Sequence, residues 1–173
     1  MAVSSGNRSK LYIVLDASAS MTEGGKIMLM RGIARAVEQY VRFGIADVEI
    51  KLISLNSGIK FIEWNPDDEF PDEFFECDGS ASFAALPDFL NLASDEKVLL
   101  LTDGCWSKED IESFRLWKSK LPPDTVRLVK IGADYTQLLD SDGVFSTDEF
   151  FVALDNWLPV ANSAQNNNEE DEW

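Results

Sequence analysis

Short apolar runs, separated by polar turns, predict the strands of one sheet. Two of these runs, residues 11–15 and 98–101, are apolar throughout, which is typical of strands buried on both faces. Residues 48–52 alternate between apolar and charged side chains, and a turn signal at residues 56–58 follows, so we expect an antiparallel hairpin at a sheet edge. The predicted strands are residues 11–15, 48–52, 59–64, 98–101, 126–131 and 144–145.

Helical patterns fill the gaps between these strands. Apolar side chains recur at helical spacing over residues 25–43, which predicts an amphipathic helix. Ser107 is the expected N-cap of a later helix, and Ser146 with Glu149 forms a capping box for the last one. The predicted helices are residues 25–43, 83–92, 107–121 and 146–158. Strands that alternate with helices imply an α/β fold of three layers, with helices on both faces of a mostly parallel sheet.

The length of 173 residues suits one domain, which we expect to span residues 1–160, with a flexible N-terminus at residues 1–9. Residues 161–173 are polar and acidic, and they predict a disordered tail. The 31 acidic and 15 basic residues leave a formal net charge of −16, which argues against binding to nucleic acids or anionic membranes. The chain has no histidine, which excludes histidine zinc sites and histidine general bases.

Cys77 and Cys105 are too few for a disulfide framework or a four-thiolate zinc site. Residues 1–10 hold no apolar core of a signal peptide, and the longest apolar runs are far shorter than a membrane span. We therefore expect a cytoplasmic protein in which both thiols are reduced.

Oxygen-bearing side chains gather in the loops that follow the two most apolar strands. Asp16, Ser18 and Ser20 end the first of these strands, and Asp103 follows the second. Parallel strands end at the same edge of a sheet, where ligands bind in open α/β folds, so we expect these side chains to meet. Such hard oxygen donors suit Mg²⁺, Mn²⁺ or Ca²⁺. Because neighbouring carboxylates repel each other, we expect the loss of Asp16 to leave the fold intact.

Three motifs together resemble the von Willebrand factor type A domain. They are the Asp-x-Ser-x-Ser run at residues 16–20, the Gly-Ser loop around Ser80 and the Leu-Thr-Asp-Gly run at residues 101–104. The resemblance covers residues 11–158. It implies a doubly wound sheet of six strands in the order 3-2-1-4-5-6, with one antiparallel edge strand.

The resemblance also implies a metal-ion-dependent adhesion site (MIDAS). The implied ligands of its Mg²⁺ ion are Asp16, Ser18, Ser20, Ser80 and Asp103. The family usually has a threonine after a glycine pair in the middle loop. Here Ser80 matches that position best, and Ser82 is the alternative.

A function in protein interaction, without catalysis, follows from this resemblance. Serine ligands leave much of the ion's charge uncompensated, so the expected ligand is an aspartate or glutamate of a partner protein. Compact domains of this kind resemble bacterial intracellular proteins that act with an AAA+ ATPase, a kinase or a phosphatase in stress or defence complexes.

Two alternative functions stay open. One is a structural scaffold with an unused metal site, acting through the acidic loop at residues 67–76 or through the tail. The other is a metal-dependent hydrolase that resembles a phosphatase, with Asp16 as nucleophile, although such enzymes need a second aspartate where this chain has Ser18. Serine nucleophiles are not expected, because there is no histidine and the nearest lysine, Lys26, lies beyond two glycines.

Trp106 and Trp173 are the candidates for contact with a partner. Trp106 follows Asp103 closely, which places it at the rim of the expected metal site, and tryptophan is a frequent interface anchor. The alternative is that Trp106 packs under the helix that follows it. Trp173 ends an acidic run that suits a basic, apolar pocket on another protein.

Overall fold

The computed structural model describes residues 8–132 and 142–160, and within them six strands form one sheet. The strand order is β3-β2-β1-β4-β5-β6; β2 and β3 are antiparallel, and all other neighbours are parallel. The strands are β1 (Lys10–Asp16), β2 (Glu49–Leu55), β3 (Ile59–Ile62), β4 (Lys97–Thr102), β5 (Val126–Lys130) and β6 (Val144–Ser146). The predicted order and the antiparallel edge hairpin are confirmed. The expected tail at residues 161–173 and most of the expected flexible N-terminus lie outside the described residues.

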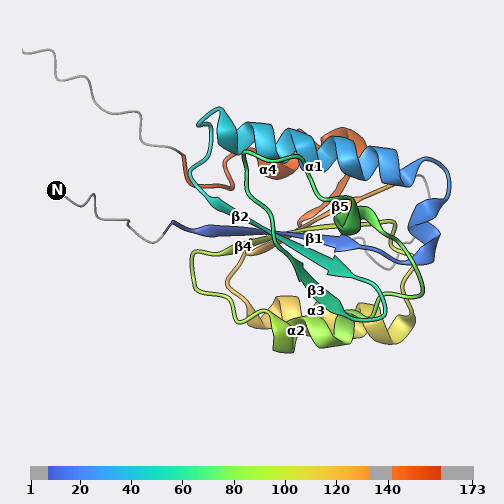
Figure 1. Ribbon diagram of the computed structural model, residues 1–173. Helices are drawn as coiled ribbons and strands as arrows, with labels where there is room; N and C mark the ends of the chain where they lie inside the picture. The colour runs from blue at the N-terminus through green and yellow to red at the C-terminus, as the bar shows by residue number, and fades with distance from the viewer. Residues whose placement is uncertain (1–7, 133–141, 161–173) are drawn as a thin grey trace, which may run out of the picture.

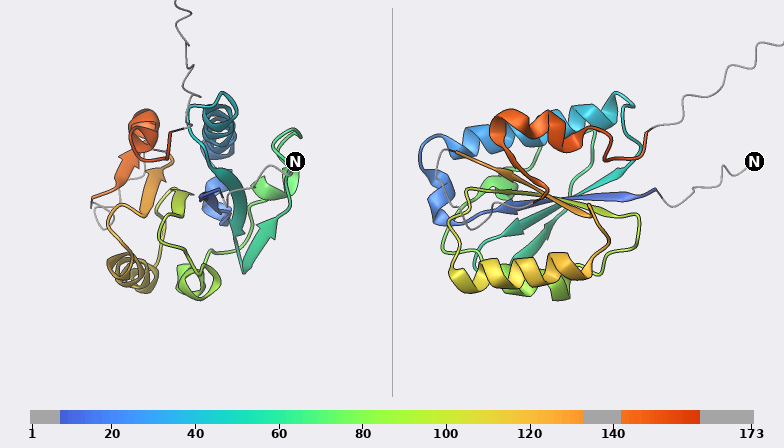
Figure 2. Two further views of the ribbon diagram at one scale, coloured as in Figure 1. Left: turned by 90° about the vertical axis from the view of Figure 1, so that its left-hand side faces the viewer. Right: turned by 180° about the vertical axis from the view of Figure 1, so that it is seen from behind.

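Helices cover both faces of the sheet, which confirms the three-layer α/β fold. Helices α1 and α4 lie on one face, and α2 and α3 lie on the other (Figure 1, Figure 2). The helices are α1 (Lys26–Arg42), α2 (Leu86–Phe89), α3 (Lys108–Lys120) and α4 (Phe150–Leu154), and the shorter 3-10 turns are η1 (Ala19–Thr22), η2 (Asp72–Phe75), η3 (Phe83–Ala85) and η5 (Thr147–Glu149). None of the helices described is both long and apolar enough to cross a membrane.

Strand β1 is buried on both faces, as its apolar run predicts. Leu11, Ile13 and Leu15 belong to the core beneath α1 and α4. Tyr12 and Val14 belong to the core beneath α2 and α3. A shift of one residue would exchange these two sets of side chains, so the register of β1 is fixed and with it the position of the residues at its end.

Both capping predictions are confirmed. The hydroxyl oxygen of Ser107 accepts a 3.1 Å hydrogen bond from the N–H of Asp110 at the start of α3. At the start of η5, the N–H of Ser146 donates to Glu149 over 3.0 Å in a complete capping box.

The helix predicted at residues 83–92 is shorter than its pattern suggests. The segment forms η3 and then the four-residue α2, with Pro87 in its first turn. Leu90 already has an extended backbone, with φ −98° and ψ 98°. Leu90 is 5% exposed, so leaving the helix at this point lets its side chain reach the core.

The last helix also ends early, at Leu154 instead of residue 158. Asp155 is extended and Asn156 has a φ of 52°, in the left-handed region. This reversal returns the side chains of Trp157 and Leu158 to the core, where both are buried. The burial of two large apolar side chains outweighs the loss of one further helical turn.

Arg127 joins β5 to the end of α4. Its guanidinium donates two 2.8 Å hydrogen bonds to Asp124 and a 2.7 Å hydrogen bond to the carbonyl oxygen of Ala153. It also lies over Trp157, 5.0 Å from the ring centroid. Hydrogen bonding from Arg127 holds the pKa of Asp124 below its ordinary value, despite partial burial. The side chain thus satisfies one of the free carbonyl groups at the end of α4.

We expect Arg127→Met to lower the free energy of unfolding by about 1–3 kcal/mol, because charge-assisted hydrogen bonds and a ring contact are lost. Arg8→Met is the matched control. Arg8 also pairs with a carboxylate, that of Asp47, but is 68% exposed, so its loss should cost under about 0.5 kcal/mol. Urea denaturation measures both variants. Equal and small losses would show that Arg127 does not stabilise this junction.

Candidate metal centre

The loops that follow β1 and β4 lie side by side, because these strands are parallel neighbours. Asp16 ends β1, and Asp103 directly follows β4. Ser18 caps η1 with an extended backbone, and this turn leaves the hydroxyl oxygens of Ser18 and Ser20 3.1 Å apart. These two serine side chains therefore meet, as expected.

The middle loop is held against this turn by backbone hydrogen bonds. The N–H of Ala19 donates to the carbonyl oxygen of Gly79 over 3.0 Å, and the N–H of Asp78 donates to that of Ala17 over 2.9 Å. These two bonds place residues 78–82 beside the serines of η1.

The two loops and the start of α3 enclose a hollow of about 400 Å³. Its lining includes Asp16, Ser18, Ser20, Ser80, Ser82 and Trp106. Four of the five predicted site residues therefore meet there, and the fifth, Asp103, is fully buried next to them. Ser80 and Ser82 both line the hollow, so both stay candidates for the middle-loop ligand.

Asp16 is held by protein donors on both of its oxygens. Oδ1 accepts the N–H of Ser18 at 3.1 Å, and Oδ2 accepts the Thr102 hydroxyl at 2.6 Å and the indole N–H of Trp106 at 3.1 Å. The residue is 1% exposed. Removing it would leave these buried donors without an acceptor, which costs free energy. The geometry thus predicts a loss of stability on removal of Asp16, and the expectation that the fold stays intact remains a prediction.

Asp103 is paired with Lys26, the lysine nearest in sequence to the two serines. Lys26 Nζ lies 2.8 Å from Asp103 Oδ2, and the backbone N–H of Cys105 donates to Oδ1 over 3.0 Å. Burial alone would raise the pKa of Asp103, but hydrogen bonds from Lys26, Cys105 and Ser20 hold it below its ordinary value. The carboxylate is therefore charged and compensated by the protein itself.

One signal in the sequence points to Lys26. A lysine at the first position of a helix works against the helix dipole, whose positive end lies there. Such a residue needs a compensating anion, and that anion is Asp103, 77 residues away in the chain.

Serine hydroxyls are the ligands on which a cation in this hollow would depend. Among the described residues, no group of three or more histidine, cysteine, aspartate or glutamate side chains is placed to hold a metal ion. The hollow offers hydroxyl oxygens backed by two buried carboxylates. This set of hard oxygen donors fits Mg²⁺ or Mn²⁺ and suits zinc less well.

Solved structures of this architecture are found at low sequence identity. Proximal thread matrix protein 1 from the mussel byssus, with zinc in its MIDAS motif, is 14% identical, with a TM-score of 0.55 over 86% of this chain and 45% of that one. A von Willebrand factor type A protein from Catenulispora acidiphila is 13% identical, with a TM-score of 0.54 over 83% of this chain and 40% of that one. The manganese-loaded TRAP protein of Plasmodium vivax is 13% identical, with a TM-score of 0.58 over 89% of this chain and 74% of that one. No protein-family model and no curated protein matches this chain.

This chain has the von Willebrand factor type A fold. It spans less than half the length of the mussel and Catenulispora proteins. At this level of identity the likeness shows the fold alone. What the site binds must therefore be argued from the residues of this chain.

Trp106 lies beside the hollow but packs into the domain itself. Its ring centroid is 3.7 Å from that of Phe83 and 5.2 Å from that of Phe114. Its indole N–H is committed to Asp16. This geometry favours the packing interpretation over a free interface anchor. Trp173, the other candidate for partner contact, lies outside the described residues.

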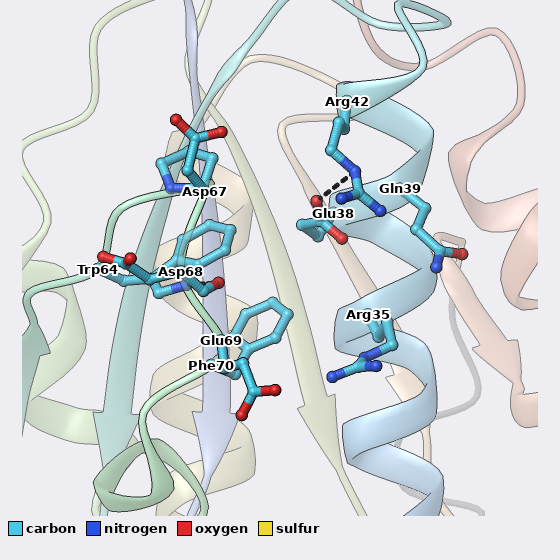
Figure 3. A pocket seen from close by; sticks show the side chains of 10 residues that line it. Arg35, Glu38, Gln39, Arg42, Trp64, Asp67, Asp68, Glu69 and Phe70 are labelled. Carbon is cyan, nitrogen blue, oxygen red and sulfur yellow. Dashed lines mark hydrogen bonds and ion pairs between the residues drawn. The ribbon is translucent and has the colours of Figure 1, made fainter.

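A second hollow, of about 210 Å³, lies between α1 and the acidic loop (Figure 3). On the loop side, Trp64 and Phe70 stack with their centroids 4.6 Å apart. On the helix side, Arg42 pairs with Glu38, with Nε and Oε1 3.0 Å apart (Figure 3). The aromatic rings on one wall and the ion pair on the other thus already contact other side chains of the domain.

The acidic loop is partly neutralised by the chain's own cations. Asp72 pairs with Arg31 over 2.9 Å, and Glu73 pairs with Lys60 over 2.6 Å. Phe74, which directly follows Glu73, is fully buried. These contacts favour a loop that covers the sheet edge over a strip that docks a partner.

Cys77 and Cys105 are not joined in a disulfide bond. Burial is the main cause that raises the pKa of Cys77, to about 11, and the nearby carboxylates of Asp16, Asp78 and Asp103 add to it. A thiol with such a pKa is almost entirely protonated at neutral pH and is a poor nucleophile.

We expect Trp106→Ala to lower the free energy of unfolding by about 2–3 kcal/mol, because ring packing and the hydrogen bond to Asp16 are both lost. Trp106→Phe keeps the ring packing and should cost about 1 kcal/mol. Phe43→Ala, at a 71% exposed aromatic, should stay within about 0.5 kcal/mol of the parent. If urea denaturation finds Trp106→Ala as stable as the parent, the side chain is free to serve a partner.

We expect Cys77 in a Cys105→Ser variant to react with iodoacetamide at pH 8 at least about a hundredfold more slowly than an unperturbed thiol, because the thiolate is scarce. The rate should rise about tenfold per pH unit as the pH approaches the pKa of about 11. A rate that levels off near pH 9 would contradict the raised pKa.

Proposed function

We propose that this chain is a metal-dependent protein-interaction domain and not an enzyme. In this proposal Ser18, Ser20 and Ser80 bind a divalent cation, and Asp16 and Asp103 lie behind them. An aspartate or glutamate of a partner protein then completes the coordination of the ion. The observation that carries the proposal is the pair of serine hydroxyls, 3.1 Å apart, above a buried carboxylate.

The hydrogen bonds on both oxygens of Asp16 support a site in which serine hydroxyls bind the ion and the carboxylates lie behind them. Since both of its oxygens accept hydrogen bonds from the protein, Asp16 is placed to act on a cation at a distance, and the outward-facing ligands are neutral hydroxyls. Neutral ligands leave the charge of a bound cation available to an anionic group from outside. The similar mussel and Plasmodium structures hold zinc and manganese.

The hydrogen bonds of Asp16 and the ion pair of Lys26 with Asp103 support the proposal that the chain is not an enzyme. A phosphatase-like mechanism needs Asp16 as an accessible nucleophile, but Asp16 is 1% exposed and hydrogen-bonded on both oxygens. A serine mechanism needs a base, and Lys26 is committed to Asp103.

For the partner, we propose an intracellular protein such as an AAA+ ATPase, a kinase or a phosphatase, by analogy with compact bacterial domains. The formal charge of −16 favours a partner whose binding carboxylate is surrounded by a basic surface, because long-range attraction then accelerates association. A cytoplasmic location belongs to the same proposal.

One observation favours the alternative of a scaffold with an unused metal site. The ammonium group of Lys26 already compensates Asp103. Since Lys26 already supplies a positive charge to the site, a divalent ion would add less stabilisation. Cation titration distinguishes the metal-dependent interaction domain from the scaffold.

We expect Mg²⁺ or Mn²⁺ to raise the melting temperature by about 5–11 °C at a hundredfold excess over the dissociation constant, because only the folded site binds the ion. Ser20→Ala should lose most of this rise. The control is Ser119→Ala, whose exposed hydroxyl donates to the Leu116 carbonyl oxygen of α3, and this variant should keep the rise. An unchanged melting curve in millimolar Mg²⁺, Mn²⁺ and Ca²⁺ contradicts the proposed function. Hydrolysis of a generic phosphoester, lost in Asp16→Asn, would support the hydrolase instead.

A further inference from the structure

Lys26, the first residue of helix α1, reaches the buried Asp103 at the candidate metal centre, although it does not line the hollow. It is 7% exposed. Its Nζ lies 2.8 Å from Asp103 Oδ2 and 3.3 Å from the carbonyl oxygen of Ser20. The ammonium therefore contacts one predicted ligand and the backbone of another.

The stem of Lys26 occupies a space that the fold leaves for it. A Cβ atom at Gly132, just beyond β5, would lie 3.2 Å from the Lys26 Cε atom. The φ of Gly132 is 86°, in the left-handed region that favours glycine. A glycine thus allows the lysine stem to pass close to the backbone on its way to Asp103.

The position of this lysine is unfavourable unless Asp103 compensates it. Lys26 is the first residue of α1, no acidic residue lies in the first turn of that helix, and the helix dipole disfavours a cation there. Burial of an ammonium group is also costly unless it is paired and hydrogen-bonded. The ion pair with Asp103 offsets both the unfavourable helix dipole and the burial of the ammonium group. Breaking it would leave a buried carboxylate without a counter-ion.

We propose that Lys26 is a resident counter-cation that keeps Asp103 from binding the divalent ion directly, so that the site binds the ion less tightly but leaves its charge for a partner's carboxylate. This inference rests on the proposed function and deepens it. In this inference Lys26 lowers the affinity of the site for the ion and increases the attraction between the bound ion and an acidic partner.

The charges of the site give the direction of the effect. Asp16 and Asp103 each carry a negative charge, and Lys26 offsets one of them. Without Lys26, a cation would meet two carboxylates that have no counter-ion, and Asp103 Oδ2 would have lost its ammonium partner. Electrostatic attraction between charges a few ångströms apart is strong in a buried site, so ion affinity should rise.

The test compares four forms of the full chain, which are the parent, Lys26→Met, Lys26→Gln and Lys10→Met. Lys26→Gln keeps a hydrogen-bond donor but removes the charge. Lys10→Met is the matched control, since Lys10 Nζ pairs with Glu96 over the same 2.8 Å, at the other end of β1 from the metal centre. Each variant lowers the net charge equally, so long-range effects cancel. Free Mn²⁺ is measured by electron paramagnetic resonance, and melting temperatures are measured in chelator.

If Lys26 has this role, Lys26→Met binds Mn²⁺ at least about tenfold more tightly than the parent, with Lys26→Gln changed in the same direction. Lys10→Met stays within about twofold of the parent, because its site is remote and screened. In chelator, both Lys26 variants melt several degrees lower than the parent, since Asp103 has lost its counter-ion. Water-proton relaxation should also detect fewer exchangeable waters on Mn²⁺ in Lys26→Met, because Asp103 has replaced one.

The other outcomes separate the two proposals. If the parent binds Mn²⁺ and both Lys26 variants bind it equally or more weakly, the role of Lys26 is wrong and the proposed function stands. If only the Lys26 variants bind, Lys26 is confirmed as the cation of the site, and the proposed function is wrong for the natural chain. If no form binds, both proposals are wrong. Should Lys26→Met fail to fold, Lys26→Gln decides between these outcomes.

Discussion

The buried carboxylate of Asp16 joins three parts of the chain that are far apart in sequence. Its oxygens accept hydrogen bonds from the N–H of Ser18, the hydroxyl of Thr102 and the indole of Trp106. Because the group has lost its water, each donor offsets part of the cost of burying the charge. The turn after β1, the end of β4 and the approach to α3 are therefore fixed around one charge. The positions of the serine hydroxyls follow from that arrangement.

A second constraint is that two carboxylates lie at neighbouring strand ends. The protein treats them differently. Asp16 is stabilised by neutral donors, whereas Asp103 is stabilised by the ammonium of Lys26. The centre keeps a net negative charge that can attract a cation, but less of it than two free carboxylates would supply. In a chain with a net charge of −16, one of the 15 basic residues is buried at this point.

The two ends of the described chain lie away from the hollow that Ser18, Ser20 and Ser80 line. β1 begins at the end of the sheet opposite the hollow, and Val160 pairs with Ala46 just before β2 begins (Figure 1). The acidic loop is occupied by ion pairs with Arg31 and Lys60. A partner that recognises the hollow would therefore meet loops that are held by the central strands.

The sequence by itself determined the architecture and most of the site. Continuous apolar runs marked β1 and β4 as central strands, because only strands covered on both sides can bury such runs. Their parallel pairing then placed Asp16, Ser18, Ser20 and Asp103 at one edge, and the capping residues marked where α3 and the last helical segment begin.

Only the tertiary structure decided which contacts cross between elements. The pairing of Lys26 with Asp103 joins residues 77 positions apart, and that of Trp106 with Asp16 joins residues 90 apart, so no local pattern contains them. The early ends of α2 and α4 have the same cause. Local propensity differs by less than about 1 kcal/mol per residue, and the burial of side chains such as Leu90 and Trp157 in the core outweighs it.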